Sequence, residues 1–210
     1  MDLNLVMLGP PGAGKGTQAR QLRRKWNIPH ISTGAMLRDA VAAGTSLGKQ
    51  VAAIMESGGL IDDELITRVV NERLAQADTK PGFLLDGFPR TIPQAESLDR
   101  IIADRAPLIV IDIVLSEAEV IRRLASRMVC AECGANAMGE GTTCIDCGGP
   151  LVPRADDREQ VVLNRLQVYR EQTEPLVRYY GSRPTYCRID GARLPDDVTA
   201  DIIKSVERHL

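Results

Sequence analysis

The chain has 210 residues, of which 44% are hydrophobic and 26% are charged, a composition typical of a folded globular protein and one that excludes intrinsic disorder. Its 26 basic and 28 acidic residues give a formal net charge of −2, so the molecule as a whole does not attract nucleic acid or an anionic membrane surface. No apolar run reaches the roughly 20 residues that cross a bilayer, and the start has no basic leader, so we expect a cytoplasmic protein.

Short apolar runs of strand length alternate with helical patterns along the chain. We expect strands at 3–8, 28–32, 82–86, 108–115 and 185–189. We expect helices at 14–26, 35–43, 47–57, 62–77, 93–104, 116–127, 157–180 and 195–208. Because strands that alternate with helices are joined by right-handed crossovers, the pattern predicts a doubly wound α/β fold, with a five-stranded parallel sheet and helices on both faces.

Two stretches do not fit this alternation. The helices between 33 and 77 all fall between the second and third strands, and 128–156 is rich in Gly, Cys and polar residues. We interpret both stretches as insertions on a central core.

The stretch GPPGAGKGT, at 9–17, follows the first strand and leads into the first helix. Glycines there let backbone N–H groups approach a phosphate, Lys15 adds a positive charge, and the helix N-terminus favours an anion. The strict phosphate-loop pattern has Ser or Thr directly after the lysine, but here Gly16 follows and Thr17 comes one place later. A flexible turn with an incidental lysine is the alternative; the flanking strand and helix favour a phosphate site.

Four cysteines form two CxxC pairs, each followed by glycine and separated by ten residues. They are Cys130, Cys133, Cys144 and Cys147. Four thiolates in two tight turns make a closed tetrahedral site that suits structural Zn²⁺. Iron, reduced thiols without a metal, and two disulfides are the alternatives.

Several motifs in order, GPPGAGKGTQA, ISTGAMLR, FLLDGFPRT, PRADDREQVVLNRL and IDG, resemble the adenylate kinase family, whose members interconvert ATP plus AMP with two ADP. The resemblance covers essentially the whole chain. GKGT is the family's normal form of the loop, so the shifted threonine does not mean that the phosphate-loop motif has been lost. The resemblance implies that Mg²⁺ is held mostly by phosphates and water, with Thr17 supporting the phosphates.

The resemblance also implies a division of the chain. The core, of the phosphate-loop nucleoside triphosphatase type, is expected at 1–32, 63–127 and 157–210, a helical AMP-binding insertion at 33–62, and a small zinc-binding lid at 128–156. The spacer between the cysteine pairs is shorter than is usual in the family and lacks the aromatic positions that often stack on the adenine of ATP. We expect a monomer that binds ATP, AMP and ADP, with Mg²⁺ and structural Zn²⁺, and neither nucleic acid nor membranes.

Phosphoryl transfer between two nucleotides must overcome repulsion between polyanions, and it needs no strong base because the attacking phosphate oxygen is already ionised. Bidentate guanidinium groups suit this task. The resemblance implies the catalytic residues Lys15, Asp86, Arg90, Arg123, Arg127, Arg154 and Arg165. It implies the ATP-binding residues Gly12, Ala13, Gly14, Lys15, Gly16, Thr17, Arg127 and Arg193. It implies the AMP-binding residues Thr33, Arg38, Gly59, Leu60, Ile61, Gly87, Phe88, Pro89, Arg90, Gln94, Arg154 and Arg165.

Within these sets, Asp86 is expected to orient the water shell of Mg²⁺, and the Gln94 amide to pair with the adenine edge of AMP. A kinase for another nucleoside monophosphate would share the loop and the arginines and differ in the base pocket; Gln94 favours adenine. A GTPase switch would need an Asn-Lys-x-Asp stretch, which the sequence lacks. A zinc-ribbon module for nucleic acid is disfavoured by the near-neutral charge and the 3% aromatic content.

Overall fold

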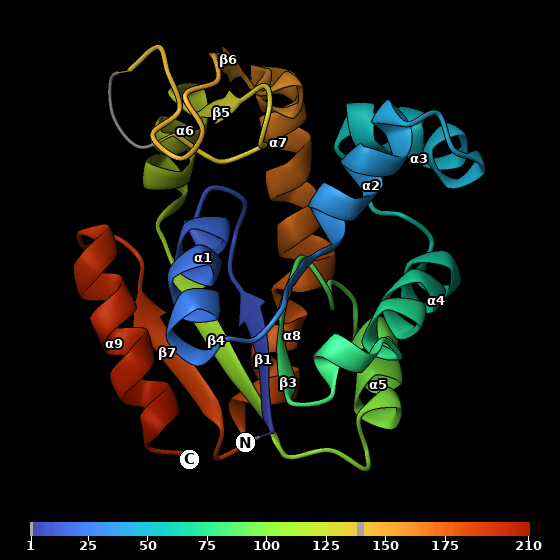
Figure 1. Cartoon of the computed structure of the whole chain (residues 1–210), viewed down its shortest axis with the longest axis vertical. Coiled ribbons are helices and arrows are strands. Elements are labelled where there is room, and N and C mark those ends of the chain that lie inside the picture. Colours follow the sequence, from blue (N-terminus) through green and yellow to red (C-terminus); the bar gives the residue numbers. More distant parts are fainter. Residues whose placement is uncertain (1, 138–140) are drawn as a thin grey trace.

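A five-stranded parallel sheet forms the centre of the computed structural model, which describes residues 2–137 and 141–210 (Figure 1). Its strands are β1 Leu3–Leu8, β2 His30–Ser32, β3 Gly82–Asp86, β4 Leu108–Val114 and β7 Tyr186–Asp190. Their order across the sheet is β2-β3-β1-β4-β7, and every neighbouring pair is parallel. The predicted fold class is therefore confirmed.

The predicted helices form, with ends that shift by a few residues. They are α1 Lys15–Trp26, α2 Thr33–Ala42, α3 Ser46–Ser57, α4 Asp63–Leu74, α5 Ile92–Ile101, α6 Glu117–Ala125, α7 Glu159–Val168, α8 Pro175–Gly181 and α9 Pro195–Glu207. Local capping explains such shifts. The hydroxyl of Ser32 accepts a hydrogen bond from the backbone N–H of Ala35, so α2 begins at Thr33, earlier than expected.

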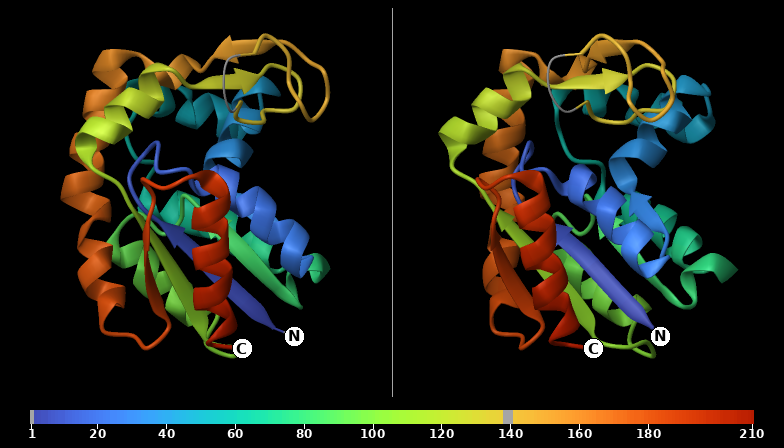
Figure 2. Two further views of the ribbon diagram at one scale, coloured as in Figure 1. Left: turned by 90° about the vertical axis from the view of Figure 1, so that its left-hand side faces the viewer. Right: turned by 60° about the vertical axis from the view of Figure 1, so that its left-hand side comes forward.

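Helices cover both faces of the sheet because alternate side chains of each strand point to opposite sides. Leu5 and Met7 of β1 pack in a buried cluster with α1 and α9, whereas Val6 and Leu8 pack in a second cluster with α4, α5 and α8. Figures 1 and 2 show the two helical layers on either side of the strands. All four of these strand side chains are buried, which fixes the register of β1 between its neighbours.

The helix expected at 157–180 is interrupted, so that prediction is partly wrong. A π-helical segment, Tyr169–Thr173, separates α7 from α8, and the N–H of Glu174 bonds to the carbonyl of Tyr169 at 2.8 Å. Pro175, the first residue of α8, has no N–H to continue the regular ladder. The wider π turn carries the chain past this proline with its neighbours still hydrogen-bonded.

The two segments that break the alternation stand outside the layers of the sheet. Helices α2 and α3 project beside the upper end of α7 (Figure 1). The Asn164 side chain of α7 donates a hydrogen bond of 2.6 Å to the carbonyl of Ser57, at the end of α3. The cysteine-bearing segment carries a short antiparallel pair, β5 Met128–Cys130 and β6 Leu151–Pro153. Its residues 138–140 lie outside the described residues, as does residue 1 of the core.

Two 3₁₀ turns complete the elements, η1 Ala77–Thr79 and η2 Ala155–Asp157. In the part of the chain that the structure describes, no helix combines the length and the apolar character required to traverse a lipid bilayer. The carboxyl ends of β1, β3 and β4 lead into the phosphate loop and the segments around it, and this end of the sheet positions the site.

Candidate active site

A cleft of about 1790 Å³ opens beyond the carboxyl ends of the strands, between the phosphate loop, α2, and the cysteine-bearing segment. All of the residues predicted to be catalytic line it: Lys15, Asp86, Arg90, Arg123, Arg127, Arg154 and Arg165. All of the predicted ATP-binding residues line it as well: Gly12, Ala13, Gly14, Lys15, Gly16, Thr17, Arg127 and Arg193. A site at this end of an open α/β sheet is where ligands usually bind.

The phosphate loop is built by glycines in left-handed conformations. Gly12 and Gly14 have φ angles of 80° and 92°, which residues with a side chain rarely adopt. Gly14 is the residue before α1, so the first backbone N–H groups of that helix face the loop. The Lys15 ammonium donates to the carbonyls of Gly9 at 2.7 Å and Pro10 at 2.9 Å, which folds the side chain back over the loop.

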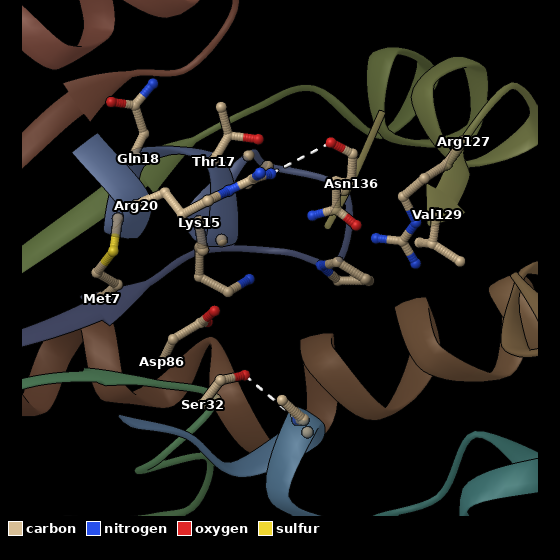
Figure 3. A pocket seen from close by; sticks show the side chains of 18 of the residues that line it. Met7, Lys15, Thr17, Gln18, Arg20, Ser32, Asp86, Arg127, Val129 and Asn136 are labelled. Carbon is tan, nitrogen blue, oxygen red and sulfur yellow. Dashed lines mark hydrogen bonds between the residues drawn. The ribbon is translucent and has the colours of Figure 1, made fainter. Parts of the chain in front are cut away.

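Lys15 and Asp86 form the charged centre of the cleft, and Figure 3 shows their side chains approaching one another. Burial lowers the pKa of Lys15 to about 8, although the Asp86 carboxylate opposes this effect. Burial would raise the pKa of Asp86, but the neighbouring His30 and the positive Lys15 outweigh it and hold this pKa below its usual range. His30 Nε2 lies 3.6 Å from the Asp86 carboxylate. Asp86 therefore carries its negative charge at neutral pH.

Three of the predicted arginines are held in place by two acidic residues. Arg127 forms a bidentate pair with Asp157 at 2.6 Å, and Arg154 a pair with Asp156 at 2.5 and 2.7 Å. Arg165 reaches Asp157 at 3.0 Å. Sequence reasoning missed these carboxylates as partners, although the two adjacent aspartates in RADD, close behind Arg154, were the available signal.

The other predicted arginines reach the cleft from separate elements. Arg90 Nε donates to the Gly87 carbonyl at 2.8 Å, and burial lowers the pKa of Arg90. For Arg38 on α2, desolvation and then the positive charge of Arg154 lower the pKa to about 10. Arg123 on α6 donates to the Gly191 carbonyl at 2.9 Å. Arg38 and Arg90 nevertheless remain protonated at neutral pH.

The predicted AMP-binding set divides into two groups. Its members that line the cleft are Arg38, Leu60, Gly87, Pro89, Arg90, Arg154 and Arg165. Those that lie outside the cleft lining, within the described residues, are Thr33, Gly59, Ile61, Phe88 and Gln94. Thr33 and Gln94 are both 2% exposed, and the Thr33 hydroxyl donates to the Gly87 carbonyl at 2.9 Å.

Arg20 is a cleft residue that sequence reasoning missed. It lies on α1, one turn beyond Gly16, and donates to the carbonyl of Asn136 at 3.2 Å, as Figure 3 shows, and to the carboxylate of Asp146 at 2.5 Å. The bridge joins the helix of the phosphate loop to the cysteine-bearing segment. Nothing in the sequence pairs Arg20 with Asp146, because the contact spans 126 positions. Arg193, which was expected near ATP, pairs with Asp201.

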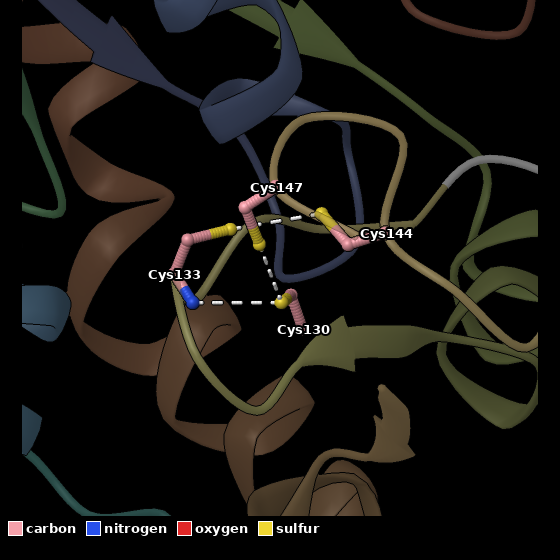
Figure 4. A group of neighbouring side chains, drawn as sticks. All are labelled: Cys130, Cys133, Cys144 and Cys147. Carbon is pink, nitrogen blue, oxygen red and sulfur yellow. Dashed lines mark hydrogen bonds between the residues drawn. The ribbon is translucent and has the colours of Figure 1, made fainter. Parts of the chain in front are cut away.

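The four predicted metal-ligating cysteines come together (Figure 4). Their Sγ atoms all lie within 4.8 Å of one another, and tetrahedral Zn²⁺ with bonds of about 2.3 Å needs separations of about 3.8 Å. The Cys133 N–H points to Cys130 Sγ at 3.4 Å, as in a metal-binding turn. The two closest thiol pairs are 3.4 and 3.6 Å apart, so the disulfide alternative is wrong. The donor set fits structural Zn²⁺.

Comparison with known proteins adds sequence relatives to this geometry. Residues 7–185 match the family model described as adenylate kinase. The chain is 45% identical to the adenylate kinase of Methanocella arvoryzae, over 98% of this chain and 99% of that protein. It is 44% identical to that of Archaeoglobus fulgidus over the same shares, and 48% identical to that of Moorella thermoacetica, over 91% of this chain and 92% of the relative.

Proposed function

The chain belongs to the adenylate kinase family, and from this we propose how its residues divide the work of the reaction ATP + AMP = 2 ADP. The enzyme is a nucleoside monophosphate kinase, and the transfer is reversible. Its difficulty lies in bringing two polyanions together and stabilising the charge that develops on the transferred phosphoryl group. We assign that task to the phosphate loop and the arginines around the cleft.

On the donor side, the loop from Gly12 to Thr17 holds the phosphates of ATP. Its backbone N–H groups and the start of α1 supply an oriented positive field. Lys15 leaves the carbonyls of Gly9 and Pro10, to which it is bonded now, and follows the β- and γ-phosphates. This exchange of partners is favourable because a phosphate carries full negative charge and a carbonyl only a partial one.

On the acceptor side, Arg38 and Arg90 grip the phosphate of AMP, and Gln94 reads its base. Arg123, Arg127, Arg154 and Arg165 surround the phosphoryl group in transfer. Asp156 and Asp157 hold three of these arginines in position beforehand. The aspartates reduce the repulsion between neighbouring guanidinium groups, and they leave most of the donor N–H groups in place for phosphate oxygens.

Adenylate kinases use Mg²⁺ with ATP, and the bound ion neutralises charge on the phosphates. In this chain Asp86 would orient the water shell of the ion, and Thr17 would support the phosphates beside it. Zn²⁺ has a different task at Cys130, Cys133, Cys144 and Cys147. Held by these four thiolates, the ion would tie together two turns of a segment that is too small to build its own hydrophobic core.

We assign the core to 1–32, 63–127 and 157–210, the AMP-binding insertion to 33–62, and the zinc-binding lid to 128–156. The two covers exclude water from the transfer, since an open site would let water take the phosphoryl group. We propose that the enzyme works as a monomer, since all the groups assigned to the reaction come from one chain. We propose the cytoplasm as its location.

One observation carries the proposal: a lysine, an ionised carboxylate and the six arginines assigned above converge on a single cleft. Steady-state assays with ATP, Mg²⁺ and each of AMP, CMP, UMP and GMP test it. We expect AMP to be the preferred acceptor by a wide margin in kcat/KM. Brisk turnover of another monophosphate with negligible use of AMP would overturn the assignment of the acceptor.

A further inference from the structure

Asp63 takes part in a buried hydrogen-bond network that the mechanism above does not use. The network joins the first turns of α4 and α5 around the Gln94 side chain, which is 2% exposed. Gln94 Oε1 accepts from the backbone N–H of Arg90 at 2.7 Å, and Gln94 Nε2 donates to Asp63 Oδ1 at 2.7 Å. The Thr91 hydroxyl donates to Asp63 Oδ2 at 3.0 Å and accepts from the Gln94 N–H at 3.3 Å.

The chemistry of its partners allows only one orientation of the Gln94 amide. A backbone N–H such as that of Arg90 can only donate, and both carboxyl oxygens of Asp63 act here as acceptors, from the Thr91 hydroxyl and from Gln94 Nε2. Rotating the amide by half a turn would set Nε2 against the N–H and Oε1 against the carboxylate, which gives two repulsive contacts in place of two hydrogen bonds. The oxygen and nitrogen ends of an amide have nearly the same shape, so the partners decide which end lies where.

The orientation matters because the amide keeps capacity for a base. An amide oxygen has two lone pairs and an amide nitrogen two hydrogens, and the protein uses one of each at Gln94. One acceptor site on Oε1 and one donor hydrogen on Nε2 remain, and the contacts with Arg90 and Asp63 determine which of them lies at which end of the amide. Adenine offers the complementary pair, the N6 amino group as donor and N1 as acceptor. Hypoxanthine, the base of IMP, reverses both, with a carbonyl oxygen at position 6 and a hydrogen on N1.

We propose that Asp63 is a positioning residue that sets the base selectivity of the acceptor site. It holds the Gln94 amide in the order that matches adenine and opposes hypoxanthine. The inference rests on the proposed function, in which Gln94 reads the base of AMP. Asp63 acts only through Gln94, and the backbone N–H of Arg90 enforces the same orientation from the other end of the amide.

The test compares AMP with IMP as acceptors, because the two share ribose and phosphate and differ at the purine edge. The variant is Asp63→Asn, whose amide can donate as well as accept and so tolerates a turned Gln94. The matched control is Asp62→Asn, the same change one residue earlier. Asp62 caps α4 by accepting from the N–H groups of Glu64 and Leu65 at 3.0 Å, and asparagine also caps well.

We expect the ratio of kcat/KM for AMP to that for IMP to fall by about tenfold or more in Asp63→Asn, the size of effect that one misplaced buried hydrogen bond produces. The fall should come from a higher KM for AMP and a lower KM for IMP, with kcat for AMP changed less. Asp62→Asn should keep the ratio of the unmodified enzyme.

An equal ratio in Asp63→Asn and Asp62→Asn would overturn the inference. If Asp63→Asn melts too low to assay, Asp63→Ala removes the acceptor without adding a donor, and the ratio should fall in the same direction; an unchanged ratio there would also overturn it. Failure of the proposed function would be distinct, because the unmodified enzyme would then not use AMP.

Discussion

Lys15 lies at the charged centre of the cleft. Its ammonium lies beside Asp86 and bonds to two loop carbonyls, and burial lowers its pKa to about 8. Asp86 has a pKa below its usual range and stays ionised through the neutral and alkaline region. The free enzyme therefore has one group in the donor site that loses its charge just above neutral pH.

This pKa gives an expected pH dependence. Below about pH 8 Lys15 is protonated, as the phosphate-binding role proposed for it requires; as pH rises through about 8 it becomes neutral, so kcat/KM for ATP should fall. Measuring kcat/KM for ATP from roughly pH 6.5 to pH 9.5, which is about 1.5 pH units on either side of this pKa, checks this. Lys15→Arg keeps its charge over the range, and its lower activity should not fall in that region. The same alkaline fall in Lys15→Arg would show that another group is responsible.

At the residue scale, sequence reasoning found the groups that carry charge and missed most of their partners. The loop glycines, Lys15 and the arginines stand in local motifs whose chemistry can be read directly. The ion pairs that hold the arginines could not be predicted, because whether Arg127 meets Asp157 depends on how α6 and η2 pack. Arg20 was missed for the same reason, since only the folded chain brings it to Asp146.

Among the elements, the packing of α2 against α3 depends on one small residue. A Cβ atom added at Gly48 would lie 2.1 Å from the carbonyl oxygen of Ala40, which is backbone and cannot turn aside. The two helices can approach this closely only because Gly48 has no side chain. Since α2 carries Arg38, the close packing of α2 against α3 also determines where the Arg38 guanidinium lies in the cleft.

We therefore expect Gly48→Ala to push α3 away from α2, to cost about 1–3 kcal/mol of stability, and to raise KM for AMP more than KM for ATP. Thermal unfolding and steady-state kinetics measure both effects. Gly181→Ala, at the end of α8, is the control, because a Cβ there meets nothing within 4 Å. Equal stabilities for the two variants would contradict this account of the α2–α3 contact.

The cysteine-bearing segment has little hydrophobic core of its own, so its stability should depend on the metal. We expect Cys144→Ser to lose bound Zn²⁺ and to lower the melting temperature, with activity remaining at low temperature because Cys144 itself does not line the cleft. Elemental analysis and calorimetry on the same sample measure this. Cys187→Ala, in β7 and away from the cluster, should keep the metal. A native protein free of metal would refute the expectation.

At the scale of elements, sequence reasoning located the five strands of the sheet from short apolar runs, and the helices from their apolar stripes. It did not foresee the π segment before Pro175, since a proline signals a break but not the way in which neighbouring hydrogen bonds adjust. The short pair β5 and β6 was also missed. Its residues show no alternation, and the segment is organised around the cysteines.

For the whole molecule, the arrangement predicts one continuous cleft for two nucleotides. Two adenosines joined by five phosphates should fill both halves, compete with ATP and with AMP, and stabilise the fold. At a free concentration of 1,000 times its Kd, the analogue should add about 4 kcal/mol to the free energy of unfolding. Inhibition kinetics against each substrate in turn check the expectation. Competition with ATP alone would mean that the two halves are not joined as assigned.

Helix α7 touches both projecting parts of the molecule through successive residues. Asn164 holds the end of α3, and Arg165 holds Asp157 at the foot of the cysteine-bearing segment. Both contacts are made by neighbouring residues of one helix, so any shift of α7 along or about its axis would have to alter contacts on both sides of the cleft.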